Sequence, residues 1–551
     1  MTYRQKLFIL LTALFIFRCV MACFTELLPE EAYYWTYAQN LSLSYYDHPN
    51  MVANIIYVFG LFGKSELTVR LGAIILSVLT SIVVFKLAKL LFNEETAFWS
   101  VIILIATPLS AASAFLMTPD APLFFFWVLT IYCIARATRG NNEDGRMENE
   151  GERMIAGSHD PVTVSSLDGL RATENGSRHR LQIPDSGLKA PKTQRFKDSY
   201  WWYFAGLSMG AAWSSKYTAS FLGISVLLYF LLSNKNRKWF LRKEPYIAIL
   251  LAFIVFSPVI IWNYQNDWAS FKFQTVHRAK TSPPFSIKLF LRFAGIQLGT
   301  VFPYWFPFVI YAAYKSVRRI ITEWEDRLLL LMSFFLPMFL FFGASSFRQM
   351  IKLNWTSPTF FTAIIATAAV FSGKFKRTFT VFAAISLILT VFAHFLIAYP
   401  LFNLPAEKNF FGWNEIAGQI DKKIEAIAHE NALPDSTPKL FILGCGNKYL
   451  MASEVNFYKK NPAPVVSVNA FGTSALEYDY ITYPPKYIGW DALMVYDKGE
   501  PPANMDIKLT VFESADPPEE VQIIRYGKVI RTFVMMHCRN YKGPVFTDKE
   551  P

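Results

Sequence analysis

Long apolar runs separated by short polar stretches recur along the chain up to about residue 400. Each run is close to the length of about 20 residues that an α-helix needs to cross the roughly 30 Å of hydrocarbon in a bilayer. We therefore predict an α-helical polytopic membrane protein with about eleven transmembrane helices. The runs lie near residues 6–24, 67–90, 95–113, 120–136, 201–215, 217–233, 245–263, 288–313, 327–344, 355–372 and 377–399.

Basic residues cluster on alternate connections between these runs, and the positive-inside rule places such connections in the cytoplasm. The first run follows Arg4 and Lys6 and lacks a small-x-small cleavage site, so we interpret it as an uncleaved helix with a cytoplasmic N-terminus. The loops 25–66, 114–119, 264–287 and 345–354, and everything after about residue 400, are then external. The basic connections carry Lys86 and Lys89, Arg136 and Arg139, Lys235, Arg237 and Lys238, Lys315, Arg318 and Arg319, and Lys374, Lys376 and Arg377.

Two segments differ from the spanning runs. Residues 140–198 are rich in Gly, Asn, Glu, Ser and Arg and have no sustained period, which is typical of a disordered insertion, here on the cytoplasmic side. Residues 400–551 have soluble character, with helical spacing at 413–431 and a buried strand and turn at 439–446. Further strand-like pieces lie at 463–468, 491–497, 507–513, 521–525 and 528–535. We therefore predict a transmembrane domain, 1–399, followed by a small C-terminal α/β extracytoplasmic domain, 400–551.

The composition agrees with this pattern and excludes other classes of protein. Hydrophobic residues make up 53% of the chain and charged residues only 17%, which excludes a soluble or disordered protein. The formal net charge of +12 is the excess expected in the cytoplasmic loops of a membrane protein, so it needs no nucleic acid to explain it. The five cysteines have no metal-ligand spacing, and we expect no metal site.

Two adjacent carboxylates, Glu30 and Glu31, lie in the first external loop among aromatic residues such as Tyr34. Carboxylates at a membrane face are costly to desolvate, and one held there could take a proton from an acceptor hydroxyl as general base. The alternative is a helix N-terminus, with Pro29 in the first turn and two glutamates favourable to the helix dipole. The residues alone leave both interpretations open.

Other external polar residues add to these candidates. Basic residues on an external face run against the positive-inside bias, which favours an anionic ligand such as a phosphate. Any single one could instead be a snorkelling or headgroup-binding cation. The combination of Lys216, His277 and Arg278 is the stronger indication, because three groups would converge. The further candidates are Asp47, His48, Asp120, Tyr217, Lys352, Asn354 and Trp355.

Several of these segments together resemble a known family. Pro-Glu-Glu-Ala-Tyr-Tyr-Trp at 29–35, followed by Tyr-Tyr-Asp-His-Pro at 45–49, resembles the first external loop of bacterial family-39-type glycosyltransferases. These are relatives of the protein O-mannosyltransferases and of the lipid A aminoarabinose transferase, in the GT-C superfamily. The resemblance covers nearly the whole chain apart from 140–198. It extends through residues 118–123, 215–219, 262–278, 354–355 and 452–458.

The resemblance implies transfer of a sugar from a polyprenyl-phosphate donor to a lipid A, glycan or protein acceptor at the external face of the bacterial inner membrane, with inversion. It places the catalytic pair at Glu30 and Glu31, with Asp120 as the next acid to consider. The family usually has Asp-Glu here, so Glu30 stands where the Asp normally is. Lys216, Arg278 and Lys352 could stabilise the leaving phosphate without a metal cofactor, although a divalent ion would also fit this chemistry.

Two other classes of function are weighed against a transferase. A transporter or flippase of a lipid-linked anion would place ionisable residues near the midplane of several helices, often with internal repeats, whereas here the charges cluster in external loops. A membrane-anchored assembly protein would act through its C-terminal domain, where the sequence shows no reactive site. The pattern therefore favours an enzyme.

Overall fold

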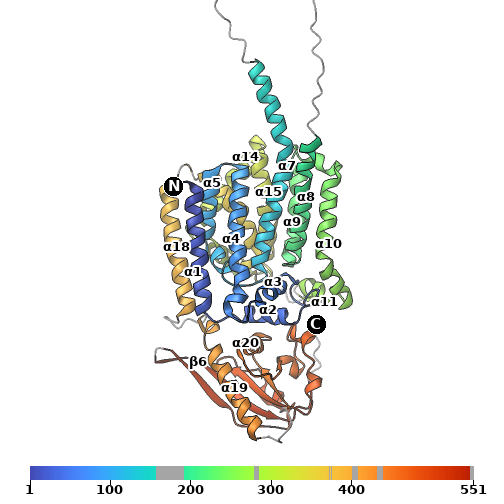
Figure 1. The fold of residues 1–551 in the computed structure, drawn as a ribbon, viewed down its shortest axis with the longest axis vertical. Helices are drawn as coiled ribbons and strands as arrows, with labels where there is room; N and C mark the ends of the chain where they lie inside the picture. Colours follow the sequence, from blue (N-terminus) through green and yellow to red (C-terminus); the bar gives the residue numbers. More distant parts are fainter. Residues whose placement is uncertain are drawn as a thin grey trace, which may run out of the picture.

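The computed structural model describes residues 1–156, 192–277, 285–371, 373, 375–399, 407–430, 439–525 and 527–545. A region of packed helices is followed by a smaller region built on a β-sheet, which we call the sheet region (described residues from Glu407 onward) (Figure 1). The predicted insertion at 140–198 overlaps the end of one helix and the start of the next, and its middle lies outside the described residues.

Each predicted apolar run contains at least one helix. In the described part of the chain, six helices are long and apolar enough to cross a membrane: α1, α4, the Asp120–Arg139 part of α7, α10, α15 and α18. The count of about eleven spans stays a prediction. The helices are α1 (Tyr3–Phe24), α4 (Glu66–Leu91), α5 (Glu94–Ile105), α6 (Pro108–Ser113), α7 (Asp120–Ala156), α8 (Lys192–Trp213), α9 (Phe221–Leu232), α10 (Lys243–Gln265), α13 (Ile287–Thr300), α14 (Phe306–Glu323), α15 (Asp326–Ser345), α16 (Leu353–Thr356), α17 (Phe360–Phe371) and α18 (Lys376–Ala398).

Three predicted runs are wrong as continuous helices. The run 95–113 divides into α5 and α6, the run 288–313 into α13 and α14, and the run 355–372 begins with the short α16 before α17. Each break lies beside a proline: Pro108, Pro303 or Pro358. A proline lacks the N–H that an α-helix needs and clashes with the preceding turn, so the apolar pattern continues while the helix stops.

Ion pairs gather the basic connections at one end of the helices. Arg4 lies 3.6 Å from Glu94, and Lys376 lies 2.7 Å from Glu95. These contacts place the start of α1, the α4–α5 connection and the start of α18 together, at the end marked N in Figure 1. Two of the basic connections expected from the sequence therefore lie at the same end of the helical region as the first residues of α1. Which end faces the cytoplasm stays a prediction.

Three short helices lie at the opposite end, between the long helices and the sheet region: α2 (Pro29–Gln39), α3 (Met51–Gly60) and α11 (Ala269–Lys272) (Figure 1). About half of the first external loop of the sequence analysis is therefore helical, in α2 and α3, while Leu61 and Phe62 after α3 are exposed.

The sheet region contains six strands in the order β2-β1-β3-β6-β4, with β5 also paired to β6. β1 pairs in parallel with β2 and β3, and β6 is antiparallel to its neighbours. The predicted helix at 413–431 and strand at 439–446 are confirmed, but the predicted strand at 507–513 is wrong. The segment forms the helix α22 (Met505–Leu509) and a turn instead: Ile507 is exposed on the helix, while Val511 and Phe512 of the turn are buried. The elements are α19 (Trp413–Glu430), β1 (Leu440–Gly444), α20 (Leu450–Tyr458), β2 (Val465–Val466), β3 (Asp491–Asp497), β4 (Ser514–Ala515), β5 (Glu519–Arg525) and β6 (Lys528–Arg539).

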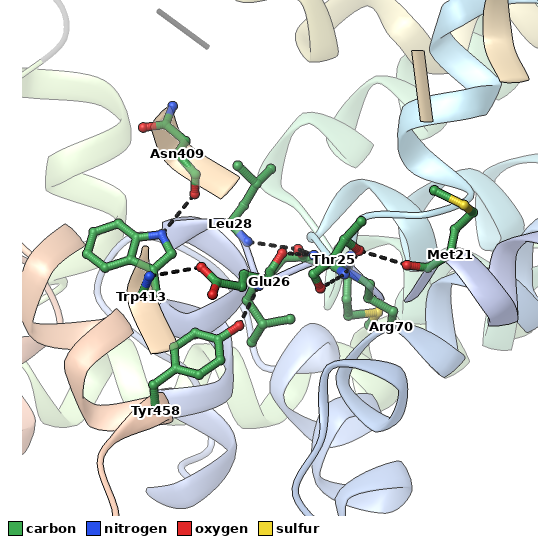
Figure 2. A network of polar contacts seen from close by, with 11 residues as sticks. Met21, Thr25, Glu26, Leu28, Arg70, Asn409, Trp413 and Tyr458 are labelled. Atoms are coloured by element: carbon green, nitrogen blue, oxygen red, sulfur yellow. Dashed lines mark hydrogen bonds and ion pairs between the residues drawn. The ribbon is translucent and has the colours of Figure 1, made fainter. Parts of the chain in front are cut away.

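The segment between α1 and α2 joins the sheet region to the helices (Figure 2). The Glu26 carboxylate accepts hydrogen bonds from the backbone N–H groups of Trp413, at 2.9 Å, and of Asn414, at 3.3 Å. The N–H of Leu27 donates to the phenol oxygen of Tyr458 at 2.7 Å. Because these bonds flank the start of α2, they fix the position of the two glutamates that follow.

Candidate functional site

Helix α2 begins where the sequence carries a proline and two acids. Pro29 occupies the first turn, where a missing N–H costs no hydrogen bond, and Glu30 and Glu31 lie at the positive end of the helix dipole. The Glu31 carboxylate accepts the backbone N–H of Leu28 at 3.1 Å, which caps the helix. The helix-terminus interpretation is therefore correct for the backbone, and the side chains decide what else the acids do.

Glu31 is fully buried in an ion pair with Arg70 of α4. The guanidinium donates to both carboxylate oxygens, at 3.0 Å and 2.7 Å, and the N–H of Met117 donates to one of them at 2.9 Å. Arg70 also donates to the carbonyl oxygens of Thr25 and Glu26, at 2.8 Å and 2.7 Å (Figure 2). Glu31 thus has its lone pairs committed to structural partners.

Glu30 has the opposite environment although it is the neighbouring residue. Its side chain is exposed, and within the described residues it has no hydrogen bond or ion pair. Successive residues of an α-helix point about 100° apart, which is enough to turn one acid toward Arg70 and the other away from it. Glu30 is therefore the acid of this pair that remains open to a ligand.

A second polar cluster joins three helices at the same end of the molecule. Asp120, the first residue of α7, is 2.7 Å from the Lys216 ammonium and accepts a hydrogen bond from the Asn354 amide at 2.8 Å. Asp120 and Lys216 are both buried. Lys216 lies in extended backbone between α8 and the short helix η1 (Tyr217–Ser220), so its side chain is free to reach α7. Three candidates far apart in the sequence thus form one cluster.

Tyr34 of α2 is buried and responds to the charges of both groups of acids. Burial raises the pKa of Tyr34 well above its ordinary value, and the charges of Asp47, Glu30 and Asp120 raise it further. These carboxylates come from α2, the following loop and α7, yet all are close enough to act on one phenol. The structure therefore brings the predicted acids into one neighbourhood.

Asp47 holds the first external loop against α2. Its carboxylate accepts hydrogen bonds from Tyr33, at 3.2 Å, and from Tyr37. Burial is the main cause that raises the pKa of Asp47, and the two phenols partly offset it. His48 packs its ring against Tyr34 with 5.7 Å between ring centroids. Asp47 is thus already occupied by protein groups, while His48 lies beside the site.

The remaining predicted residues are Tyr217, Lys352 and Trp355, which the structure describes, and His277 and Arg278, which it does not describe in full. Tyr217 follows Lys216 and packs its ring on Phe271 at 5.6 Å. Lys352 is exposed immediately before α16, the helix that carries Asn354 and Trp355. His277 ends the π-helix η3 (Phe273–His277), but its side chain and the whole of Arg278 are not among the described residues.

The sequence analysis missed several buried groups of this site. Arg70 lies near the start of the apolar run at 67–90, and an ionisable residue in such a run is itself a signal of function or of a paired charge. Tyr449 stacks on Tyr33 with 3.7 Å between ring centroids. Glu477 accepts the N–H of Tyr46 at 2.7 Å. These contacts show that the sheet region forms one wall of the site.

Glu454, on α20, is another buried acid that the sequence analysis missed. It is fully buried, and within the described residues neither carboxyl oxygen has a hydrogen-bond partner. Burial raises the pKa of Glu454 well above its ordinary value, and the charges of Glu26 and Glu31 add to this effect.

Among the described residues, no three His, Cys, Asp or Glu side chains are grouped so that they could hold a metal ion.

Comparisons with known proteins agree with this architecture. A family model described as dolichyl-phosphate-mannose-protein mannosyltransferase matches residues 47–145 and 189–262. The lipid A galacturonosyltransferase RgtD of Rhizobium johnstonii is 22% identical over 354 residues, which cover 64% of this chain and 62% of the relative. The chain thus aligns with a little under two thirds of that relative's length.

Solved structures show the same fold at low sequence identity. ArnT from Cupriavidus metallidurans in the apo state superposes with a TM-score of 0.61 at 14% identity, covering 97% of this chain and 98% of ArnT. ArnT bound to undecaprenyl phosphate gives a TM-score of 0.59 at 13% identity, covering 96% and 97%. The family model, the galacturonosyltransferase relative and the two ArnT structures together confirm the expected resemblance to GT-C glycosyltransferases of the ArnT and protein mannosyltransferase type. The ArnT superposition also confirms the fold class: a helical membrane protein with a small C-terminal sheet domain.

Proposed function

We propose that this protein is an integral-membrane glycosyltransferase that moves a sugar from a polyprenyl-phosphate donor to a lipid A, other glycan or protein acceptor. It would act in the bacterial inner membrane, with the sheet region and α2 on the external side. The fold of ArnT, which binds undecaprenyl phosphate, and the similarity to a lipid A galacturonosyltransferase support this proposal.

One observation carries the assignment of the base. Of two adjacent glutamates, Glu31 is neutralised by Arg70, whereas Glu30 is exposed, and its charge raises the pKa of Tyr34 as the charge of Asp120 does. A general base needs a free carboxylate that can approach the proton it removes. Glu30 meets this requirement, Glu31 does not, and Asp120 is held by Lys216 and Asn354.

The proposed reaction is a single displacement. Glu30 takes the proton of an acceptor hydroxyl as its oxygen attacks the anomeric carbon from the face opposite the phosphate. The bond between the anomeric carbon and the phosphate oxygen breaks, its electron pair leaves with the polyprenyl phosphate, and the configuration inverts. Lys216 has three N–H donors and uses one on Asp120, so the others are available to the leaving phosphate. Lys352, His277 and Arg278 are the further candidates for this role.

The experiment is mass spectrometry of envelope lipids and glycoproteins from cells with the gene, without it, and with the Glu30→Gln variant. We expect a sugar-modified species that is present in the first strain and absent from the other two. Glu66→Gln is the matched control, because Glu66 also lies in the first turn of a helix at this end and should leave the species intact. If the three strains have identical glycans, the transferase proposal is wrong.

A further inference from the structure

A groove of about 850 Å³ lies between α1, α4 and α7, at the end of the helical region far from the sheet region. Figure 1 shows α1 and α4 side by side over this length. Most of the wall is apolar. It includes Phe8, Leu11 and Phe15 of α1 and Val78 and Ile82 of α4.

The groove has positive charge at one end only. Arg4, Lys86, Lys89 and Arg136 line that end. One carboxylate, Glu94, pairs with Arg4 at 3.6 Å and with Lys89 at 2.5 Å. Within the described residues no ion pair involves Lys86 or Arg136, and both are exposed. Four cations and one carboxylate leave an excess of three positive charges beside an apolar wall.

The length of the groove matches one leaflet of a membrane. The lining residues extend over twelve residues of α1, from Arg4 to Phe15, and over thirteen residues of α4, from Val78 to Leu90. At a rise of 1.5 Å per residue these lengths are about 17–18 Å. Half of a hydrocarbon core of roughly 30 Å is about 15 Å. Because α1 and α4 run in opposite directions, both place their cations at the same end and their apolar residues toward the middle of the bilayer.

We propose that this groove binds one anionic phospholipid of the leaflet at the N-terminal end of α1. Its phosphate lies against Lys86 and Arg136, and one acyl chain lies along α1 and α4. A zwitterionic lipid would leave the charge excess unmatched, and a free phosphate would leave the apolar wall unused. The proposed site is at the opposite end from Glu30 and does not depend on the proposed transfer reaction.

The first test is native mass spectrometry of the full-length protein in detergent, titrated with phosphatidylglycerol or with phosphatidylcholine. We expect phosphatidylglycerol to bind at one copy per chain and more tightly than phosphatidylcholine. At about fivefold per cation, Lys86→Gln with Arg136→Gln should weaken phosphatidylglycerol binding roughly thirtyfold. Lys235→Gln with Lys238→Gln is the control, since it removes two exposed charges outside the groove and should leave binding unchanged.

A second pair of variants tests the apolar wall. Thr12 lines the groove and is exposed, while Ala13 is exposed at the next position and does not line it. Thr12→Trp should fill the groove and lower phosphatidylglycerol occupancy at least tenfold, and Ala13→Trp should not. Equal retention of the two lipids by the native protein would overturn the proposal. So would phosphatidylglycerol binding that is the same in the groove variants as in their controls.

Discussion

The first turn of α2 carries two glutamates, Glu30 and Glu31, which have the same side chain but different surroundings. On one side Glu31 is buried and contacts Arg70, Leu28 and Met117. On the other side Glu30 is exposed, and its charge raises the pKa of Tyr34. A buried carboxylate needs partners that replace its hydration, whereas an exposed one keeps its reactivity. Of two neighbouring glutamates, one can therefore stabilise the fold while the other stays available for catalysis.

The largest effect expected from this comparison is on its buried side. Arg70→Leu should destabilise the protein by about 3–5 kcal/mol, because it leaves the Glu31 charge buried without its partner. The melting temperature of the detergent-solubilised protein should fall steeply. Arg70→Leu combined with Glu31→Leu should recover part of the loss, since no buried charge remains. Arg4→Gln, which breaks an exposed pair, is the control and should cost less than about 1 kcal/mol. A small change on removing Arg70 would mean that Glu31 is not held as described.

On the exposed side, Glu30→Gln should lower turnover about 10²–10⁴-fold and leave the melting temperature unchanged. The amide keeps the shape of the side chain but cannot accept the proton. The measurement pairs transfer kinetics with binding of undecaprenyl phosphate, which should be unaffected. Native turnover in this variant would move the base to Asp120.

Variants of the Asp120 cluster should have an effect of intermediate size. They distinguish two roles of Lys216: pairing with Asp120 and binding the donor phosphate. Lys216→Met should weaken binding of undecaprenyl phosphate about tenfold to a hundredfold and also lower stability, because Asp120 is left buried without its ion pair. Adding Asp120→Asn should restore the melting temperature without restoring binding. Recovery of both would show that Lys216 serves only to neutralise Asp120.

The smallest effect concerns pH. Because the pKa of Glu454 is raised in the folded protein, its contribution to stability is fully present below the ordinary pKa of a glutamate and is lost as the pH rises through the raised value. Glu454→Gln should match the native protein at acidic pH and be more stable at alkaline pH, by about 1–3 kcal/mol. Melting curves between pH 5 and 10 provide the measurement. If the melting temperatures of the two proteins change with pH in the same way, ionisation of Glu454 does not destabilise the fold.

The sequence was informative where the relevant pattern is local. Apolar length predicted the helices, and Pro29 with two acids predicted the start of α2. Local pattern could not predict which glutamate is buried, because Arg70 lies 39 residues from Glu31 along the chain. It also could not predict that Asp120, 96 residues from Lys216, pairs with it. The broken helices and the false strand at 507–513 have a local cause, since apolar spacing alone reports neither a proline break nor the difference between a strand and a short helix followed by a turn.

The contacts that flank the start of α2 also have a consequence for the synthesis of the protein. Leu27 bonds to Tyr458 and Tyr46 bonds to Glu477, and each pair is separated by 431 residues. During translation, the segment that carries Glu30 is therefore made long before the partners that hold it in place. A chain still on the ribosome has the acid but lacks the sheet region that forms one wall of the site. Completion of the last part of the polypeptide is thus the step that assembles the site formed by its first part.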